Sequence, residues 1–233
     1  MSARSTAGRE AKLAGHMFEN VVAEFLKTKL NTNIIVEGAP GTKIDLMNES
    51  GDMRFSLKKT PSDLQVGLIT QENFIDAMGI SDSNVIAFIK DFFGGDQVAD
   101  YPRHRKNLDQ ISDNLSKKFL DFMNSHKEDI LKIAVTHGSL AQTNSINYIL
   151  YPSVKHDVNT LNMIDVDRMN EDFVKNGEWV YSPQKTSLHF YCNGVKIMAL
   201  QMFGSGPKYK NGYHSLQFRI ACGKINGSYV TKV

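Results

Sequence analysis

Lys43-Ile44-Asp45-Leu46-Met47 opens the stretch that decides the fold of this chain, and Met53-Arg54-Phe55-Ser56-Leu57-Lys58 closes it. Both flanks alternate polar with apolar residues, and the intervening Asn48-Glu49-Ser50-Gly51-Asp52 is rich in turn formers. This pattern predicts a β-hairpin. Because side chains repeat every two residues along a strand, Ser56 and Lys58 share a face, and we expect Asp45 to lie near them on the neighbouring strand.

This hairpin has two interpretations. A carboxylate, a second oxygen ligand and a lysine on neighbouring strands can hold a divalent cation beside a phosphodiester, which suits metal-assisted hydrolysis. The alternative is an ordinary amphipathic hairpin with a solvated polar face, since Asp and Lys are common surface residues.

The segment upstream of the hairpin predicts an amphipathic helix over residues 10–30, packed on a sheet. Its apolar residues follow the i, i+3, i+4 spacing of such a helix. They are Leu13, Ala14, Met17, Phe18, Val21, Val22, Phe25 and Leu26. Gly15 and Glu19 form Gly-x-x-x-Glu, with Glu19 at the margin of the apolar stripe; an exposed helix glutamate is the alternative.

A helix with such a glutamate, then a strand, then Asp…Ser-x-Lys resembles the PD-(D/E)xK nuclease core. Gly-Thr-Lys-Ile-Asp, ending at Asp45, stands for the first element. Ser56-Leu57-Lys58 stands for the second, with serine where the second acid is usual.

The chain is similar over residues 15–220 to the small type II restriction endonucleases grouped with MspI, in which a neutral residue replaces that acid. The further blocks that carry this resemblance, in order, are residues 91–96, 101–106, 126–131, 194–201, 208–212 and 216–220. The resemblance implies an α/β (α+β) fold with a mixed central sheet flanked by helices. It also implies one endonuclease domain over 1–233, with a catalytic core with helices in 1–140 and a β-rich, acid-poor recognition part in 141–233.

Local patterns predict the remaining elements. Helices are expected over 71–78, 84–93, 107–125, 128–137 and 166–175. Strands are expected over 33–37, 148–151, 159–165, 187–191, 195–202, 213–221 and 228–233, with a tight turn at Asn193-Gly194.

We expect Asp45 to be the principal ligand of Mg²⁺, which prefers oxygen donors and for which Mn²⁺ can substitute. Ser56 occupies the second ligand position as a weaker donor. Lys58 would orient or deprotonate the attacking water and stabilise charge on the phosphate. Glu19 would bind a second metal or hold a metal-bound water.

The formal net charge of +2 hides an asymmetry. No Asp or Glu follows Glu178, whereas seven Lys and Arg residues do, so the first 178 residues carry 20 basic against 25 acidic side chains. A phosphate backbone favours such an acid-free surface, because each carboxylate near DNA adds repulsion. The alternative is a β-rich segment that is short of acids by chance.

The sequence also suggests residues that contact double-stranded DNA. The densest basic cluster is Arg103, His104, Arg105 and Lys106, for which a solvated loop is the alternative. Nearer the C-terminus, lysines and amides that can read base edges are interleaved with aromatic residues. These candidates are Gln201, Lys208, Tyr209, Lys210, Tyr213 and Gln217.

Composition predicts a soluble, cytoplasmic enzyme. With 233 residues, 41% of them hydrophobic, the chain can bury a substantial core. No apolar run approaches a membrane span, and the start has no signal-type apolar region. Cys192 and Cys222 are expected to be reduced and buried, and their spacing from His189 and His214 matches no zinc pattern.

Together with the resemblance, these observations predict a Mg²⁺-dependent endonuclease that acts as a monomer or weak homodimer. It would be either a type II restriction enzyme with a companion DNA methyltransferase, or a phage or mobile-element nuclease. Two alternatives stay open: a non-catalytic DNA-binding protein with a decayed nuclease site, and a junction or repair nuclease of the same superfamily.

Overall fold

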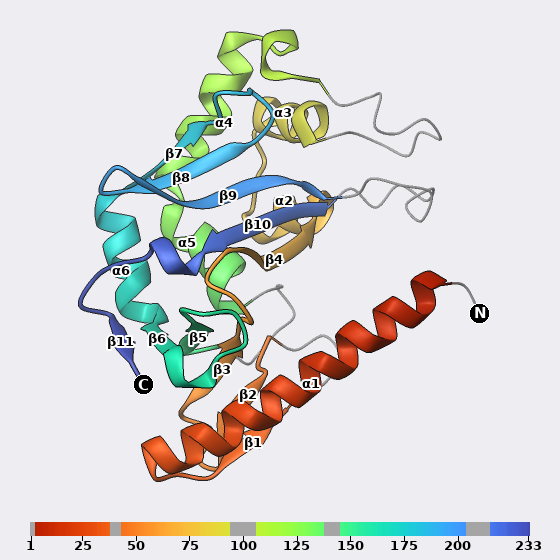
Figure 1. The fold of residues 1–233 in the computed structure, drawn as a ribbon. Coiled ribbons are helices and arrows are strands. Elements are labelled where there is room, and N and C mark those ends of the chain that lie inside the picture. Colours follow the sequence, from red (N-terminus) through yellow and green to blue (C-terminus); the bar gives the residue numbers. More distant parts are fainter. Residues whose placement is uncertain (1–2, 38–42, 94–105, 138–144, 204–214) are drawn as a thin grey trace. The chain divides into compact units, whose positions relative to one another are not determined.

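The computed structural model describes residues 3–37, 43–93, 106–137, 145–203 and 215–233 (Figure 1). The chain forms two compact units. Unit 1 comprises Met1–Ser62, Gln142–Met169 and Ile225–Val233, and unit 2 comprises Asp63–Ala141 and Asn170–Lys224. Each unit therefore draws on residues from both sides of position 140.

Unit 1 contains a six-stranded mixed sheet in the order β1-β2-β3-β5-β6-β11. The strands are β1 (Ile34–Val36), β2 (Leu46–Asn48), β3 (Arg54–Leu57), β5 (Tyr148–Pro152), β6 (Leu161–Asp165) and β11 (Val230–Lys232). The β3–β5 pair is parallel and the other pairs are antiparallel. A 3-10 turn (Val158–Thr160) precedes β6.

Helix α1 (Ala3–Leu30) packs part of its predicted apolar stripe into the core of unit 1, whereas Met17 and Val21 of that stripe are 63% and 52% exposed. Phe18, Val22 and Leu26 are buried in one cluster with strand residues that include Phe55 and Leu150. The i, i+4, i+8 spacing of the three helix residues places them on one side of α1, as the sequence predicts. Burial of this stripe fixes the rotation of α1 about its axis.

The turn between β2 and β3 is closed by the Asn48 side chain. Asn48 Oδ1 accepts a hydrogen bond from Met53 N at 2.9 Å, and Asn48 Nδ2 donates to Asp52 Oδ1 at 2.5 Å. Gly51 has φ +72°, a left-handed conformation that glycine adopts without steric cost. The paired register Leu46↔Phe55 and Met47↔Arg54 confirms the predicted hairpin.

Unit 2 contains a five-stranded antiparallel sheet in the order β4-β10-β9-β8-β7. The strands are β4 (Asp63–Thr70), β7 (Gly177–Tyr181), β8 (Leu188–Cys192), β9 (Val195–Phe203) and β10 (Ser215–Ala221). The helical elements are α2 (Gln71–Ala77), α3 (Ser83–Phe93), η1 (Leu108–Gln110), α4 (Asp113–Ser125), α5 (Lys127–Leu131), the π-helix η2 (Lys132–His137) and η5 (Cys222–Lys224). Helix α6 (Val166–Asn176) begins in unit 1 and ends in unit 2.

Helices of unit 2 cover one face of its sheet (Figure 1). Phe74 of α2 contacts Phe218 of β10, with ring centroids 6.4 Å apart. Phe173 of α6 contacts Phe190 of β8 at 5.5 Å. The strand register places Phe218 and Phe190 on the same face, so this face forms the core of unit 2.

The α+β class with a mixed sheet is confirmed, but two strands are missed and three predicted elements differ, among them the strand expected over 159–165, which begins only at Leu161 after the 3-10 turn. Residues 63–70 and 177–181 form strands β4 and β7, which the sequence patterns do not indicate. The helix expected over 107–125 is instead a 3-10 turn followed by α4, which Ser112 caps through Leu115 N. The helix expected over 128–137 continues beyond α5 as a π-helix.

Two further expectations concern the cysteines and membrane-spanning segments. Cys192 and Cys222 are buried and form no disulfide. Among the described helices, none combines the length and apolar character needed to cross a membrane.

Candidate active site

Asp45, Ser56 and Lys58 lie together at the β2–β3 hairpin, joined by a series of hydrogen bonds. Lys58 Nζ donates to Ser56 Oγ at 3.0 Å, and Ser56 Oγ donates to Asp45 Oδ2 at 3.2 Å. Ser56 is only 1% exposed, whereas Asp45 and Lys58 are partly buried. The structure thus brings together the three side chains that strand parity predicts to be neighbours.

The backbone explains how Asp45 reaches this position. Asp45 comes directly before β2, and its backbone N donates to Phe55 O at 2.8 Å. Its carboxylate Oδ2 accepts from Leu57 N at 2.6 Å, so it takes the place of a backbone acceptor on that side of β3. On the other side, Lys58 N donates to Leu150 O of β5 at 2.7 Å. The end of β3 is therefore held from both sides.

Burial is the main influence on the Asp45 carboxyl and raises its pKa above the usual value. The positive charge of Lys58 and the hydrogen bond from Leu57 N oppose this rise, whereas the negative charge of Glu19 adds to it. Asp45 therefore holds its proton more readily than an exposed aspartate does.

Glu19 lies on α1 with a side chain 16% exposed, and its charge reaches Asp45. Its Oε2 is 3.0 Å from Nδ1 of His16, one helical turn earlier. Glu19 is thus partly buried rather than a freely solvated helix residue. His16 is a neighbour of the site that the sequence patterns do not indicate.

Lys43 is a second residue at this site that the sequence patterns do not indicate. Burial lowers its pKa well below the ordinary lysine value, the positive charge of Lys58 lowers it further, and Asp45 opposes both effects. Lys43 precedes Asp45 by two residues, and the period of an extended segment could have indicated it. The site therefore carries two lysines and two carboxylates.

The available donors suit a hard cation that keeps most of its water. Among the described residues, no group of three or more His, Cys, Asp or Glu side chains is arranged to hold a metal ion. Mg²⁺ is commonly bound by one or two carboxylates together with several waters. Asp45 and Glu19 are two carboxylates whose charges interact, and a divalent cation would offset both the desolvation of Asp45 and this repulsion. The residues therefore fit Mg²⁺, with Ser56 already engaged by Asp45 and Lys58.

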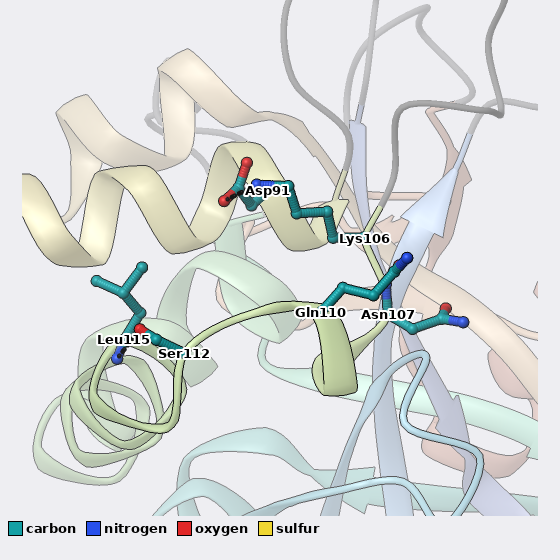
Figure 2. A network of polar contacts seen from close by, with 6 residues as sticks. All are labelled: Asp91, Lys106, Asn107, Gln110, Ser112 and Leu115. Carbon is teal, nitrogen blue, oxygen red and sulfur yellow. Dashed lines mark hydrogen bonds and ion pairs between the residues drawn. The ribbon is translucent and has the colours of Figure 1, made fainter.

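Most predicted DNA contacts fall outside the described residues: Arg103, His104, Arg105, Lys208, Tyr209, Lys210 and Tyr213. Lys106 is described and lies beside Asp91 of α3 (Figure 2). Its Nζ is 2.9 Å from Asp91 Oδ2, and its backbone N donates to Asp91 O at 2.9 Å. The Asn107–Gln110 capping box follows directly (Figure 2). Lys106 is exposed, so its charge is partly offset by Asp91 but not removed from solvent.

Gln201 and Gln217 are joined in one row of amides across three strands of unit 2. Gln201 Nε2 donates to Gln217 Oε1 at 2.8 Å, and Gln217 Nε2 donates to Gln65 Oε1 at 2.7 Å. Gln217 is 6% exposed, Gln201 is partly buried and Gln65 is exposed. The exposed end of this row is thus Gln65, which the sequence patterns do not single out because they do not predict β4.

Comparisons with known proteins give a structural likeness but no sequence relative. No protein-family model and no curated protein sequence matches the chain. The structure resembles a crystal structure of restriction endonuclease MspI in complex with its cognate DNA, over 86% of this chain and 77% of that chain. The TM-score is 0.47 and the sequence identity is 11%. At these values the likeness identifies neither an activity nor a site residue in this chain.

Proposed function

We propose that this chain is a Mg²⁺-dependent endonuclease of the PD-(D/E)xK type that hydrolyses phosphodiester bonds of double-stranded DNA. The observation that supports the proposal is the hydrogen-bonded series from Lys58 through Ser56 to Asp45. It combines a partly buried carboxylate, able to bind a cation, with an ammonium group able to face a phosphate. Mg²⁺ bound there would polarise the phosphate and lower the pKa of a bound water.

The chain's own residues have distinct tasks in this proposal. Lys58 donates hydrogen bonds to the scissile phosphate and stabilises the charge that develops on its oxygens. Ser56 holds the Lys58 and Asp45 side chains close together, because its hydroxyl forms a hydrogen bond with each of them. Attack by water on phosphorus would break the P–O3′ bond, and a proton lost by the water would end on the departing oxygen, leaving a 3′-hydroxyl and a 5′-phosphate.

The proposed biological setting is sequence-specific cleavage by a cytoplasmic type II restriction enzyme with a companion methyltransferase, or by a phage or mobile-element nuclease with this scaffold. A second candidate, a DNA-binding protein with a decayed site, is favoured by one observation: Ser56 stands where a second acid is usual. Cleavage of DNA separates the two.

The test is incubation of the purified protein with plasmid DNA and Mg²⁺, with EDTA as a control, followed by sequencing of the cut ends. Ends at one fixed sequence would support a restriction-type enzyme. Asp45→Asn should abolish cleavage while leaving DNA binding intact or stronger, because it removes a ligand and a negative charge beside phosphate.

Asp52→Asn is the matched control, since Asp52 is an exposed carboxylate in the turn of the same hairpin. It should cut like the wild type. An Asp45→Asn variant that cuts at the wild-type rate would show that this hairpin is not the active site. Binding of DNA without any cleavage by the wild type would favour the decayed-site alternative.

A further inference from the structure

The side chains of His16 and Glu19 contact each other on helix α1. His16 lies one turn before Glu19 on α1, and its Nδ1 is 3.0 Å from Glu19 Oε2. A carboxylate oxygen accepts hydrogen bonds, so the Nδ1 proton of His16 is donated to Glu19. The His16 side chain is 44% exposed and that of Glu19 is 16% exposed. The histidine therefore holds the glutamate from its more solvated side.

The rest of α1 fixes where Glu19 stands. Phe18 and Val22 are buried in the core of unit 1, at 8% and 0% exposure, so the helix cannot rotate without removing them from the core. Glu19 follows Phe18 and lies near enough for its charge to act on Asp45. Two carboxylate charges that interact in a partly buried region repel each other. An unrestrained glutamate, with its flexible stem, would rotate away from Asp45.

We propose that His16 is a positioning residue that keeps the Glu19 carboxylate turned toward Asp45, so that the two acids bind a divalent cation together. This inference rests on the proposed function. The hydrogen bond occupies Glu19 Oε2 and leaves Oε1 for the cation or for a cation-bound water. Partners that orient a metal-binding carboxylate commonly affect metal affinity by about 10–100-fold.

The experiment measures Mn²⁺ binding to the full-length protein by electron paramagnetic resonance of the free ion. We compare the wild type with His16→Ala and His16→Asn. Alanine preserves the helix but removes the donor, and should weaken Mn²⁺ binding by about tenfold. The amide nitrogen of asparagine lies close to the place of Nδ1 and should restore most of the affinity. Met17→Ala, at a neighbouring side chain that is 63% exposed, is the control and should bind as the wild type does.

Two further measurements separate the inference from the proposed function. The Mg²⁺ concentration for half-maximal plasmid cleavage should rise in His16→Ala by the same factor as the Mn²⁺ dissociation constant, with DNA affinity in EDTA unchanged. Wild-type Mn²⁺ affinity in His16→Ala, together with loss of binding in Asp45→Asn, would overturn the role of His16 and leave the metal site intact. Undiminished Mn²⁺ binding in Asp45→Asn would instead overturn the metal site of the proposed function.

Discussion

The Ser56 hydroxyl connects an anion to a cation without adding charge of its own. It donates its hydrogen to Asp45 Oδ2 and accepts from Lys58 Nζ, which uses its proton and one of its two lone pairs. A carboxylate at this position would instead add a negative charge beside Asp45, whose pKa burial and Glu19 already raise. Serine therefore lowers the electrostatic cost of the site in the metal-free protein.

The first prediction compares Lys58, at one end of the hydrogen-bonded series, with Ser56 at its centre. Lys58→Ala should slow cleavage by about 100- to 1,000-fold, because a partly buried cationic donor to the transition state is removed. Ser56→Ala should slow it much less than Lys58→Ala, since the hydroxyl only orients Lys58 and Asp45 and both charged groups remain in the variant. The measurement is the single-turnover cleavage rate at saturating Mg²⁺, with DNA affinity and circular dichroism as controls. Equal reductions in rate would indicate that Ser56 is itself a direct metal ligand.

The second prediction concerns pH and the raised pKa of Asp45 in the metal-free protein. The folded state binds this proton more tightly than the unfolded state, whose carboxyl has the ordinary value of 3.8. The stabilisation that the protonated Asp45 carboxyl gives to the folded state is therefore complete below pH 3.8. It is lost as the pH rises through the pKa that Asp45 has in the folded state. Asp45→Asn removes that loss, so its urea midpoint in EDTA should increase relative to the wild type as the pH rises above 3.8.

Asp52→Asn is a control for which we expect stability to change with pH in the opposite direction. Hydrogen bonds from Ser50 and Asn48 lower the pKa of Asp52, so its stabilisation is present above 3.8 and lost as pH falls. This variant should lose stability relative to the wild type toward neutral pH. The same trend in both variants would contradict the assigned cause.

The sequence predicts the centre of the site but not its surroundings. The proximity of Asp45, Ser56 and Lys58 can be predicted from the alternation of side chains along two strands of one hairpin. This is possible because the turn of a hairpin fixes the register of its strands. His16 acts through a contact with another side chain, so the apolar spacing of the helix gives no signal for it. The pKa shift of Lys43 arises from burial, which depends on the folded chain rather than on local pattern.

At the scale of elements, Gly67 explains both a missed strand and a close packing contact. Glycine in a strand often marks the close approach of another backbone. A Cβ on Gly67 of β4 would lie 2.8 Å from Ala134 O of the π-helix. The same glycine interrupts the alternation of residues 63–70, and so hides the strand from pattern analysis. Hairpins and capped helices are predictable because their signals are local, whereas β4 is defined by its partner β10, more than 140 residues away in the chain.

The third prediction follows from this close approach. Gly67→Ala should destabilise unit 2 by about 1–3 kcal/mol, because backbone atoms must move to admit the methyl group. Gly79→Asn is the control: Gly79 has φ +59° with nothing near its Cβ position, and asparagine tolerates this conformation. Denaturant unfolding followed by Trp179 fluorescence measures both, since Trp179 is buried in unit 2. Equal stability of Gly67→Ala and the wild type would refute the close approach.

At the scale of the whole molecule, charge is distributed unevenly along the chain. All 25 acidic residues lie at or before Glu178, and seven basic residues follow it. The two compact units do not follow this division, because unit 1 also ends with acid-free residues 225–233. The asymmetry therefore belongs to the last 55 residues of the sequence and not to one unit, and its proposed partner is the phosphate backbone.

The fourth prediction separates phosphate binding from base reading. Replacing Lys208 and Lys210 together by alanine should weaken DNA binding and reduce the log–log salt slope by about one unit for each phosphate that is no longer neutralised. Gln201→Ala or Gln217→Ala should instead relax sequence preference with little change in slope, since an amide releases no counterion. Because these amides form one row that ends at exposed Gln65, Gln65→Ala should relax preference while disturbing the fold least. Binding to cognate and random duplexes across salt concentrations measures both effects. An unchanged slope and preference in all the variants would move the recognition surface to residues 103–106, where neutralising Lys106 is the next test.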